Sequence, residues 1–451
     1  MAYLSSPGRR CIAALVGLAS AMTLSLSACS SGGGGATDSS LTPKPAEVSG
    51  DITLWHFFTD READVIQTAV DNFETAYPNI HVNVVSGQDD DKMRQAIQGG
   101  QAIDVGISYA ADQIGVWCPT GAFVDLQPYI DRDNVDISQV PALAQSYTQY
   151  KGTRCALPML ADAYALYYNT DLFQAAGITT PPKTLDEFAD DAVKLTTYNA
   201  DGSINTLGFM PLMGYYETNE STLSAAVQAT FLNDDGTSSI GSDANWQTLF
   251  NWQKDLIDRL GGYQKLSDWQ AGLGEEFSAQ NDFQTGRVAM ELDGEYRTAF
   301  IDDQAPDLHY ATAPTPTSSD HTDVYGAGYV TGNVIGIPKT ATNPEAAWLL
   351  VQYLALNTDA QVQMGNGLKN VPTISSALTS PDLDVSTQYQ TFLDVYANAK
   401  SVTAPSSPIG TGYLDTFRLF TQDWESGAQT DLAAGLSNVD SQINAAIQLG
   451  G

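Results

Sequence analysis

The alternation of apolar segments with amphipathic segments over residues 51–109 is the feature that most constrains the fold. Residues 51–58 (DITLWHFF) are β-branched and aromatic, which is typical of a strand. In the next segment, apolar residues recur at spacings of three and four, which predicts a helix. This alternation predicts βαβ units with a parallel sheet. The expected elements are strands at residues 51–58, 81–85 and 103–109 and helices at residues 61–77 and 92–98.

In such sheets, ligands bind beyond the carboxyl ends of the strands. Trp55 and His56 lie near the end of the first expected strand, and Tyr109 ends the third. We therefore expect these three side chains at or near the edge of a binding site. For His56, a structural role in the core is the alternative.

The first thirty residues are typical of an export signal. Arg9 and Arg10 precede an apolar run over residues 12–26, and the run ends in Leu-Ser-Ala followed by Cys29. This arrangement resembles a bacterial lipoprotein signal, in which residues 1–28 are removed and Cys29 is acylated. Residues 29–50 then form a flexible tether rich in Ser, Gly and Thr. An uncleaved membrane anchor is the alternative.

The charge of the chain excludes one class of partner. The 451 residues include 53 acidic and 20 basic side chains, for a net charge of -33. An acidic surface repels phosphate backbones, so we expect no nucleic-acid partner. The acids are spread along the chain, and no second segment has the ~18 consecutive apolar residues of a membrane span.

Two of the four cysteines remain for a disulfide. Cys11 lies in the signal and Cys29 is the predicted lipid attachment site, which leaves Cys118 and Cys155. In an exported protein, a bond between them is expected, with two buried free thiols as the alternative.

Residues 156–177 (ALPMLADAYALYYNTDLFQAAG) combine a lone acid, several tyrosines and a helix start. Asp162 lies among small and apolar residues, Tyr164 follows it, and Asn169 is placed to cap a helix. Thr184 and Glu187 form a capping-box pattern that opens a helix to residue 195. A buried strand is expected at residues 288–292, directly before Asp293.

The chain resembles a family 1 extracellular solute-binding protein, the sugar-binding lipoprotein of an ATP-binding cassette importer. The segments that carry this resemblance are spread over essentially the whole chain after the tether, and their order and spacing together are more specific than any one of them. The usual Trp after Asp-Gly is replaced here by Glu295 and Tyr296, and the region around Gly328 and Tyr329 is not a standard match. The matching segments are ITLWHFF, ALPMLADAYALYYNTDLFQAAGI, GRVAMELDGEY, GNVIGIPKTATNPEAAWLLVQYL and NGLKNVPTISSAL.

The resemblance implies an α/β, two-lobed periplasmic-binding-protein fold of type II, with the ligand in a cleft between lobes joined by hinge crossings. Residues 51–160 and 312–370 would form lobe one, and residues 161–311 and 371–451 would form lobe two. Crossings are expected near residues 158–164, 311–316 and 369–374, and the cleft should close by hinge motion.

A sugar requires carboxylates or amides for its hydroxyls and aromatic rings for its C–H faces. Asp162 matches a position that the family uses for ligand hydroxyls, with a cap or loop acid as the alternative. Asp293 is the second candidate, with a turn-forming Asp-Gly as the alternative. Most of the 43 aromatic residues implied by the composition must be core. The full expected ligand-binding set is Trp55, His56, Tyr109, Asp162, Tyr164, Tyr215, Tyr216, Trp269, Asp293, Tyr296, Tyr325 and Tyr329.

No catalytic residues, cofactor or metal are expected. The sequence lacks HExxH, CxxC, GxSxG and phosphate-loop motifs, and its four histidines are scattered. The expected function is therefore a monomeric receptor, lipid-anchored at the extracellular face of the cell membrane. It would capture a sugar or oligosaccharide and deliver it to the permease subunits of the importer. A non-sugar solute is one alternative, and a secreted carboxylate-dependent glycoside hydrolase is the other.

Overall fold

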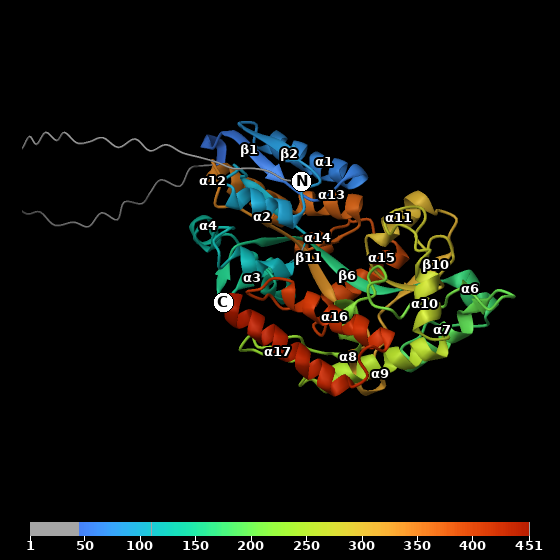
Figure 1. Cartoon of the computed structure of the whole chain (residues 1–451). Coiled ribbons are helices and arrows are strands. Elements are labelled where there is room, and N and C mark those ends of the chain that lie inside the picture. Colours follow the sequence, from blue (N-terminus) through green and yellow to red (C-terminus); the bar gives the residue numbers. More distant parts are fainter. Residues whose placement is uncertain (1–44, 110, 451) are drawn as a thin grey trace, which may run out of the picture. The chain divides into compact units, whose positions relative to one another are not determined.

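A mixed eight-stranded sheet organises the protein, whose computed structural model describes residues 45–109 and 111–450. Six strands follow one another in the order β10-β6-β11-β3-β1-β2, and β9 and β12 also pair with β6 (Figure 1). The strands are β1 (Gly50–Trp55), β2 (Ile80–Val85), β3 (Val105–Ser108), β6 (Leu157–Asn169), β9 (Met290–Gly294), β10 (Tyr310–Ala313), β11 (Val330–Gly336) and β12 (Val371–Pro372).

The first βαβ units have the predicted arrangement. Strand β1 pairs in parallel with β2 and with β3, with Trp55 opposite Val85 and Gly106. Helix α1 (Asp60–Ala76) connects β1 to β2, and α2 (Asp90–Gln98) connects β2 to β3. The parallel sheet expected over this part of the chain is confirmed.

Strand β6 is the longest, and it pairs with different strands along its length. Its first half is antiparallel to β11, with Ala163 opposite Val330, and to β12. Its second half is antiparallel to β9, with Ala165 opposite Asp293, and to β10. Every residue of β6 is buried except Tyr168, which is half-buried. One continuous strand therefore joins the two ends of this sheet. Strand β9 begins two residues later than the sequence predicted.

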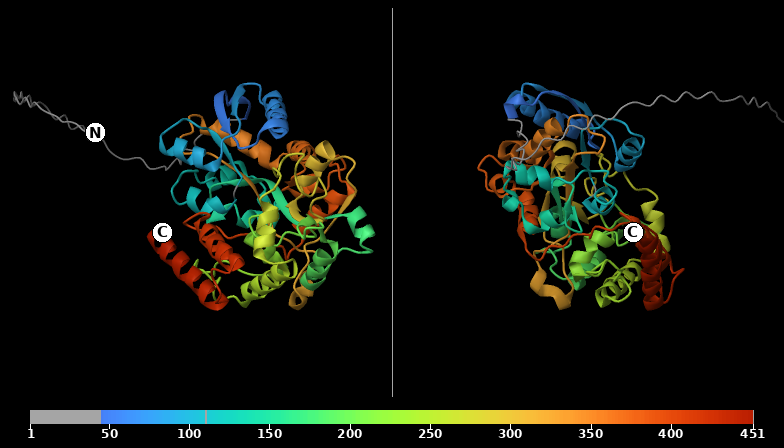
Figure 2. Two further views of the ribbon diagram at one scale, coloured as in Figure 1. Left: turned by 45° about the vertical axis from the view of Figure 1, so that its right-hand side comes forward. Right: turned by 90° about the vertical axis from the view of Figure 1, so that its left-hand side faces the viewer.

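The helices surround this sheet, and several begin where local signals place them. Thr184 and Glu187 form both hydrogen bonds of the predicted capping box at the start of α7, and Asn169 caps α6. Figure 2 shows the early elements (blue) on the opposite side from α8 to α10 (green to yellow). The principal later helices are α6 (Thr170–Ala175), α7 (Leu185–Leu195), α8 (Glu220–Val227), α9 (Ala244–Arg259), α10 (Tyr263–Gln270), α11 (Arg297–Gln304), α12 (Pro344–Leu356), α13 (Thr358–Leu368), α15 (Thr387–Ala397), α16 (Gly412–Ser426) and α17 (Leu432–Gly450).

The shorter elements fill the connections. The β7–β8 hairpin turns at Asp201 and Gly202. The short elements are helices α3 (Ile114–Trp117), α4 (Gln127–Asp133), α5 (Ala142–Ser146) and α14 (Ser375–Leu378), with strands β4 (Gln149–Tyr150), β5 (Thr153–Arg154), β7 (Thr197–Tyr198) and β8 (Ile204–Thr206).

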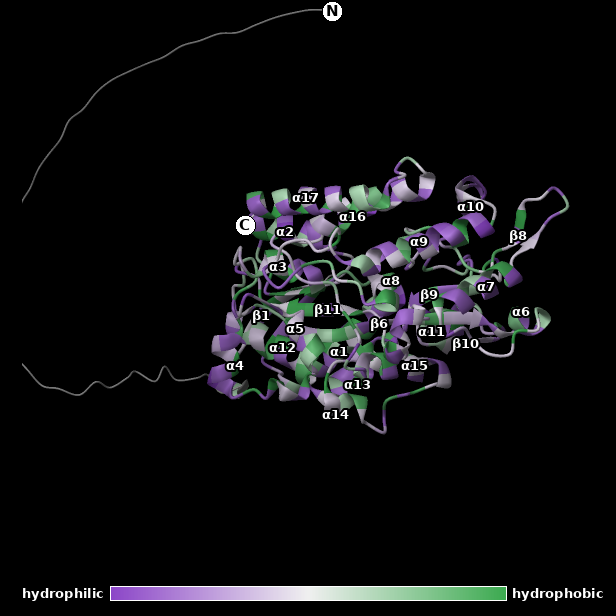
Figure 3. Ribbon diagram, turned by 90° about the horizontal axis from the view of Figure 1, so that it is seen from below, coloured by the Kyte–Doolittle hydropathy of each residue, from purple (hydrophilic) through white to green (hydrophobic). Residues whose placement is uncertain are grey.

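Buried apolar residues form two large clusters. One contains the side chains of β1, β2, α1 and α12, and the other extends from the disulfide region to α9 and α16. Helices such as α9 carry hydrophilic and hydrophobic residues side by side, as Figure 3 shows. Trp246, Trp348 and Trp424 are buried, and Trp252 is half-buried. Cys118 and Cys155 form a disulfide.

Two predictions remain untested. The signal peptide of residues 1–28 and Cys29 lie outside the described residues, as does most of the tether. The lobe boundaries also stay a prediction. Among the described residues, no helix is long and apolar enough to cross a membrane.

Candidate functional site

A cavity of about 310 Å³ lies where residues at the carboxyl ends of β1 and β3 face the middle of β6. Phe57 and Phe58 follow β1, and Tyr109 follows β3. Asp162 and Tyr164 are provided by β6 itself. This is the position expected of a ligand site in an open α/β sheet. The wall consists of Phe57, Phe58, Glu62, Tyr109, Asp162, Tyr164, Phe277, Tyr296, Asn333 and Asn370.

Aromatic rings form the apolar part of this wall. Phe57 and Tyr109 meet edge to face, with ring centroids 5.6 Å apart. Phe277 lies 6.1 Å from Tyr296. Tyr109 is 50% exposed and Phe277 is 52% exposed, which is unusual for large apolar rings. These two rings are therefore open to a partner within the cavity.

The polar part of the wall is built around Asp162. The Asn370 side-chain amide donates to Oδ1 of Asp162 and, at 3.1 Å, to Oε1 of Glu295. The backbone N–H of Ala163 donates to the other Glu295 oxygen at 2.7 Å. Asp162 is thus held by its neighbours on one side while it lines the cavity on the other.

Several carboxyl groups in this region have raised pKa values. Burial raises the pKa of Asp162 to about 7. Burial also raises the pKa of Glu217 to about 7, with a contribution from the charge of Asp293. Burial raises the pKa of Glu62 as well. Ligand hydroxyls that donate to these carboxylates would favour their ionised forms.

A second cavity of about 320 Å³ adjoins the first, and both are lined by Tyr109 and Tyr164. Tyr164 and Tyr329 lie with ring centroids 5.5 Å apart. Because two residues are shared, the cavities form one extended cleft. The remaining residues of the second cavity are mainly polar: Asp112, Glu217, Asn219, Glu220, Ser221, Tyr329, Thr331, Thr411, Leu414, Asp415 and Arg418.

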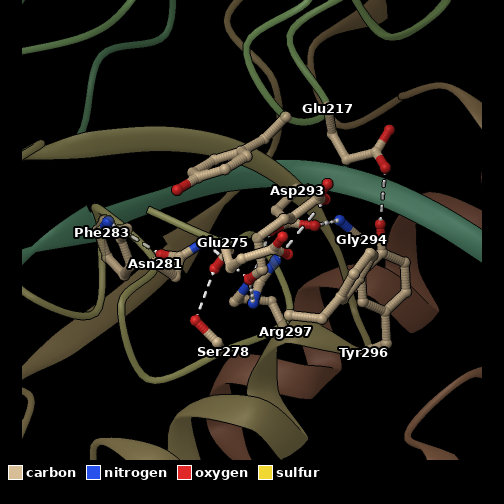
Figure 4. A network of polar contacts seen from close by, with 12 residues as sticks. Glu217, Glu275, Ser278, Asn281, Phe283, Asp293, Gly294, Tyr296 and Arg297 are labelled. Carbon is tan, nitrogen blue, oxygen red and sulfur yellow. Dashed lines mark hydrogen bonds and ion pairs between the residues drawn. The ribbon is translucent and has the colours of Figure 1, made fainter. Parts of the chain in front are cut away.

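Asp293 takes part in a different network (Figure 4), in which Asp293 and Arg297 are fully buried and Glu276 is half-buried. Its Oδ2 accepts from Nε of Arg297 at 2.6 Å, and its Oδ1 accepts from the backbone N–H of Gly294 at 2.7 Å. Arg297 also donates to the backbone oxygen of Glu276 at 2.8 Å. The Tyr296 hydroxyl donates to Glu217 at 3.1 Å, which connects this region to the cleft.

Five of the twelve predicted residues line the cleft, namely Tyr109, Asp162, Tyr164, Tyr296 and Tyr329. The other seven lie outside both cavities, namely Trp55, His56, Tyr215, Tyr216, Trp269, Asp293 and Tyr325. The difference for Trp55 and His56 has a simple cause. Strand β1 ends at Trp55, so both side chains are buried and the next residues face the cavity. Burial lowers the pKa of His56 to about 4, which leaves it neutral.

The remaining residues have other contacts. Tyr215 is fully buried, with its ring centroid 4.4 Å from Tyr216 and 6.3 Å from Trp269. Tyr216 donates to the backbone oxygen of Gly274. The amino group of Lys183 lies 5.8 Å from the ring of Tyr325. These contacts give the four rings packing roles away from the cleft.

Six residues of the first cavity were not predicted: Phe57, Phe58, Glu62, Phe277, Asn333 and Asn370. Phe57 and Phe58 are the last two residues of the expected first strand, at the end where a ligand site was expected, and could have been considered. Asn333 and Asn370 lie within segments already quoted for the family resemblance. Phe277, in the connection between α10 and β9, has no local signal that distinguishes it.

The candidate site has no metal-binding arrangement. Throughout residues 45–109 and 111–450, no group of three or more His, Cys, Asp or Glu side chains is placed to hold a metal ion. The chemistry available in the cleft is therefore that of aromatic faces, carboxylates and amides.

Comparison with known proteins gives a family and distant relatives. Residues 59–361 match the bacterial extracellular solute-binding protein family. The chain is 24% identical to the maltotriose-binding protein of Pyrococcus abyssi over 338 residues, which is 74% of this chain and 69% of that relative. It is 30% identical to a putative binding protein of Brucella abortus over 207 residues, which is 45% of this chain and 47% of the relative.

Solved structures of the same fold extend over nearly the whole chain. The structure of CpMnBP1 with mannotriose bound has a TM-score of 0.77 at 21% identity and covers 87% of this chain and 99% of its own. The sugar-binding protein MalE of Xanthomonas citri has a TM-score of 0.72 at 20% identity and covers 89% and 98%. The predicted periplasmic-binding-protein fold is confirmed.

Proposed function

The chain belongs to the bacterial extracellular solute-binding protein family, and from this premise we propose that it captures a sugar or oligosaccharide for an ATP-binding cassette importer. Membership of this family makes the chain a binding protein, so the glycoside hydrolase alternative is dropped. The observation that supports a sugar is the first cavity of the cleft, in which aromatic rings lie beside two carboxylates and two amides.

The wall suits the chemistry of a pyranose ring. Tyr109, Tyr164 and Phe277 offer faces to the C–H groups of the sugar. Asp162 accepts from hydroxyls, and Asn333 can donate and accept; Asn370, whose amide N–H groups bind Asp162 and Glu295, can accept through its oxygen. Both asparagines are almost fully buried, so their side chains are held in place before the ligand binds.

The size of the cleft favours a ligand of more than one ring. The two adjoining cavities of about 310 and 320 Å³ share Tyr109 and Tyr164. A linear oligosaccharide could extend from the apolar cavity past these two rings into the polar one. The relatives named for maltotriose and mannotriose support trisaccharides as first probes.

We also propose the two-lobe division for this receptor, with residues 51–160 and 312–370 in one lobe and residues 161–311 and 371–451 in the other. Phe57 and Tyr109 from the first lobe and Phe277 and Tyr296 from the second line the same cavity, which supports a ligand held between the lobes. Closure about the crossings near residues 158–164, 311–316 and 369–374 would then enclose the ligand.

The cellular setting is part of the proposal. The family is extracellular. Acylation of Cys29 after removal of residues 1–28 would tether the receptor to the membrane, beside the permease subunits that accept the ligand. Mass spectrometry of the exported protein tests this: a lipid on an N-terminal Cys29 is expected, and an N-terminus elsewhere would contradict it.

The binding proposal is tested by calorimetry with maltotriose, mannotriose and a panel of neutral disaccharides. At least one should bind, stabilise the protein against heat and be recovered intact. A ligand at about 100 times its dissociation constant adds roughly 2.7 kcal/mol of stability. If the saccharides fail and amino acids, peptides or polyamines bind instead, the non-sugar alternative replaces the proposal.

A further inference from the structure

Two carboxylic acids share one amide at the back of the cleft. Nδ2 of Asn370 donates both to Oδ1 of Asp162 and to Oε1 of Glu295. Asp162 belongs to β6, Glu295 follows β9, and Asn370 lies between α13 and β12. Asn370 is 208 residues from Asp162 in sequence, so this meeting depends on the complete fold.

This group is buried and has no basic partner. Asp162 is 9% exposed, Asn370 is 4% exposed and Glu295 is fully buried. In the described part of the chain, neither acid forms an ion pair with Lys, Arg or His. Arg297, which follows Glu295 closely in sequence, is bound to Asp293 instead. Two carboxylates that contact one amide in such surroundings cannot both be ionised at low cost.

We propose that Glu295 and Asn370 are positioning residues for the ligand-binding Asp162, and that Asp162 and Glu295 hold one proton between them. The inference rests on the proposed function for the role of Asp162 toward a ligand. The shared proton depends only on the arrangement of the two acids.

Burial, rather than hydrogen bonding, determines which acid holds the proton, because Glu295 accepts from Asn370 and from the backbone N–H of Ala163 and these bonds alone would favour its ionised form. Glu295 is fully buried, while Asp162 lines the cavity and can accept from a ligand or from water. Burial, together with the charge of Asp162, raises the pKa of Glu295 well above its ordinary value. Burial raises the pKa of Asp162 to about 7. Glu295 therefore keeps the proton near neutrality, and Asp162 is the acid that changes state.

Other titratable groups around the two acids are either acidic or phenolic. Glu62 of α1 and Glu217 before α8 also line the cleft. The negative charge of Glu62 raises the pKa of Asp162, and the charge of Asp162 raises the pKa of Glu217. The phenols respond to the charges of Asp162 or Glu295 or contact Asn370. They are Tyr147, Tyr164, Tyr296 and Tyr389, with Tyr396 beside Tyr147.

Ligand binding at Asp162 should be coupled to proton release. A ligand hydroxyl that donates to Asp162 stabilises its ionised form, so binding releases protons at and below about pH 7. Affinity should weaken as pH falls through this region. In Glu295→Gln, the amide keeps the hydrogen-bonding shape but removes one acid. The pKa of Asp162 should then fall, and the weakening should begin at lower pH.

The shared proton is tested without ligand by carbon-13 NMR titration of the side-chain carboxyl groups. One of the two acids should remain protonated at neutral pH in the wild type, and Glu295→Gln should move the Asp162 transition downward. Glu291→Gln is the matched control, because Glu291 is also a buried acid of this region but does not contact Asp162. Ordinary titration of both Asp162 and Glu295 near their model-peptide values would overturn the proposal.

Positioning is tested with maltotriose and mannotriose by calorimetry in two buffers of different ionisation enthalpy. Wild type should release protons near neutrality, with a pH-dependent affinity whose midpoint Glu295→Gln lowers by at least about one pH unit. Asn370→Ala should weaken binding at least about tenfold. Binding with identical pH profiles in wild type and Glu295→Gln would overturn the inference. Failure of both sugars to bind would count against the proposed function, while the NMR titration still decides on the proton.

Discussion

Two groups of buried acids lie next to each other in this protein, and they differ in one respect. The Arg297 group consists of Asp293, Glu276 and Arg297, and it contains its own cation. The Asp162 group consists of Asp162, Glu295 and Asn370, and it contains none. No member of the Arg297 group lines either cavity of the cleft, whereas Asp162 lines the first. The negative charge of Asp293 is balanced by Arg297 within the protein. Among the described residues, the charge of Asp162 has no such partner, and it can be stabilised by hydrogen bonds from the hydroxyls of a ligand.

The largest effect is expected when the cation is removed. Arg297→Met should leave Asp293 and Glu276 buried without a positive partner. Breaking a buried ion pair in this way destabilises a protein by about 3–5 kcal/mol. Urea unfolding measures the loss. Arg259→Met is the control, because Arg259 pairs with Asp190 and Asp255 on the surface and should cost less than about 1 kcal/mol. Equal effects of the two variants would remove the distinction between the groups.

The matched substitutions Asp162→Asn and Asp293→Asn should affect different properties, the first sugar affinity and the second stability. Asp162→Asn should weaken sugar binding by about 1.5–3 kcal/mol, since a charged acceptor is lost, with little loss of stability. Asp293→Asn should reduce stability by a similar amount and leave the affinity nearly unchanged. Calorimetry and urea unfolding on the same preparations give both quantities. If Asp293→Asn impairs binding as much as Asp162→Asn does, the comparison is wrong.

The substitution of Glu291 by Gln is expected to make the protein more stable. Glu291 is almost fully buried, and no donor among the described residues gives a hydrogen bond to either carboxylate oxygen, while the protonated acid can donate to Asp293. Burial, with the charge of Asp293, raises its pKa well above 4.5, so its contribution to stability falls as pH rises from the unfolded value. Glu291→Gln should therefore stabilise the protein by about 1–2 kcal/mol at pH 8. The gain should shrink toward pH 4.5 in urea unfolding. A loss of stability across this range would show that Glu291 is satisfied in solution.

The smallest effect is expected at the ring that touches both regions. Phe277 lines the first cavity and lies with its centroid 5.6 Å from the Arg297 guanidinium. Because the ring is half exposed, Phe277→Ala should change stability little but weaken sugar binding by about 0.5–1.5 kcal/mol. Leu419→Ala, at an exposed position outside both cavities, should change neither quantity. An unchanged affinity for Phe277→Ala would mean that the ligand does not reach this rim.

The sequence predicted local features well and the composition of the site only in part. The βαβ arrangement and the capping box of Thr184 follow from patterns within a few residues. Trp55 was placed at the cleft because it lies near the end of the first expected strand. The strand does end at Trp55, but that side chain is buried, and the following Phe57 and Phe58 line the cavity.

The rest depended on contacts between distant segments. Asn370 reaches Asp162 across 208 residues, and no local pattern marks that contact. The partner of Asp293, by contrast, is close in sequence. Arg297 stands four residues later and could have been recognised as its ion-pair partner. Charge balance within one helical turn is therefore worth checking before a buried acid is assigned to a ligand.

Strand β6 also constrains the order in which the protein can fold. It is made early in the chain, but its partners β9, β10, β11 and β12 begin at residues 290, 310, 330 and 371. During synthesis, this thirteen-residue buried strand must therefore wait for all of its strand partners until much later segments exist. Folding should be slow and should reach completion only near the end of the chain. Such a strand is a natural target for chaperones that hold apolar segments apart until their partners arrive.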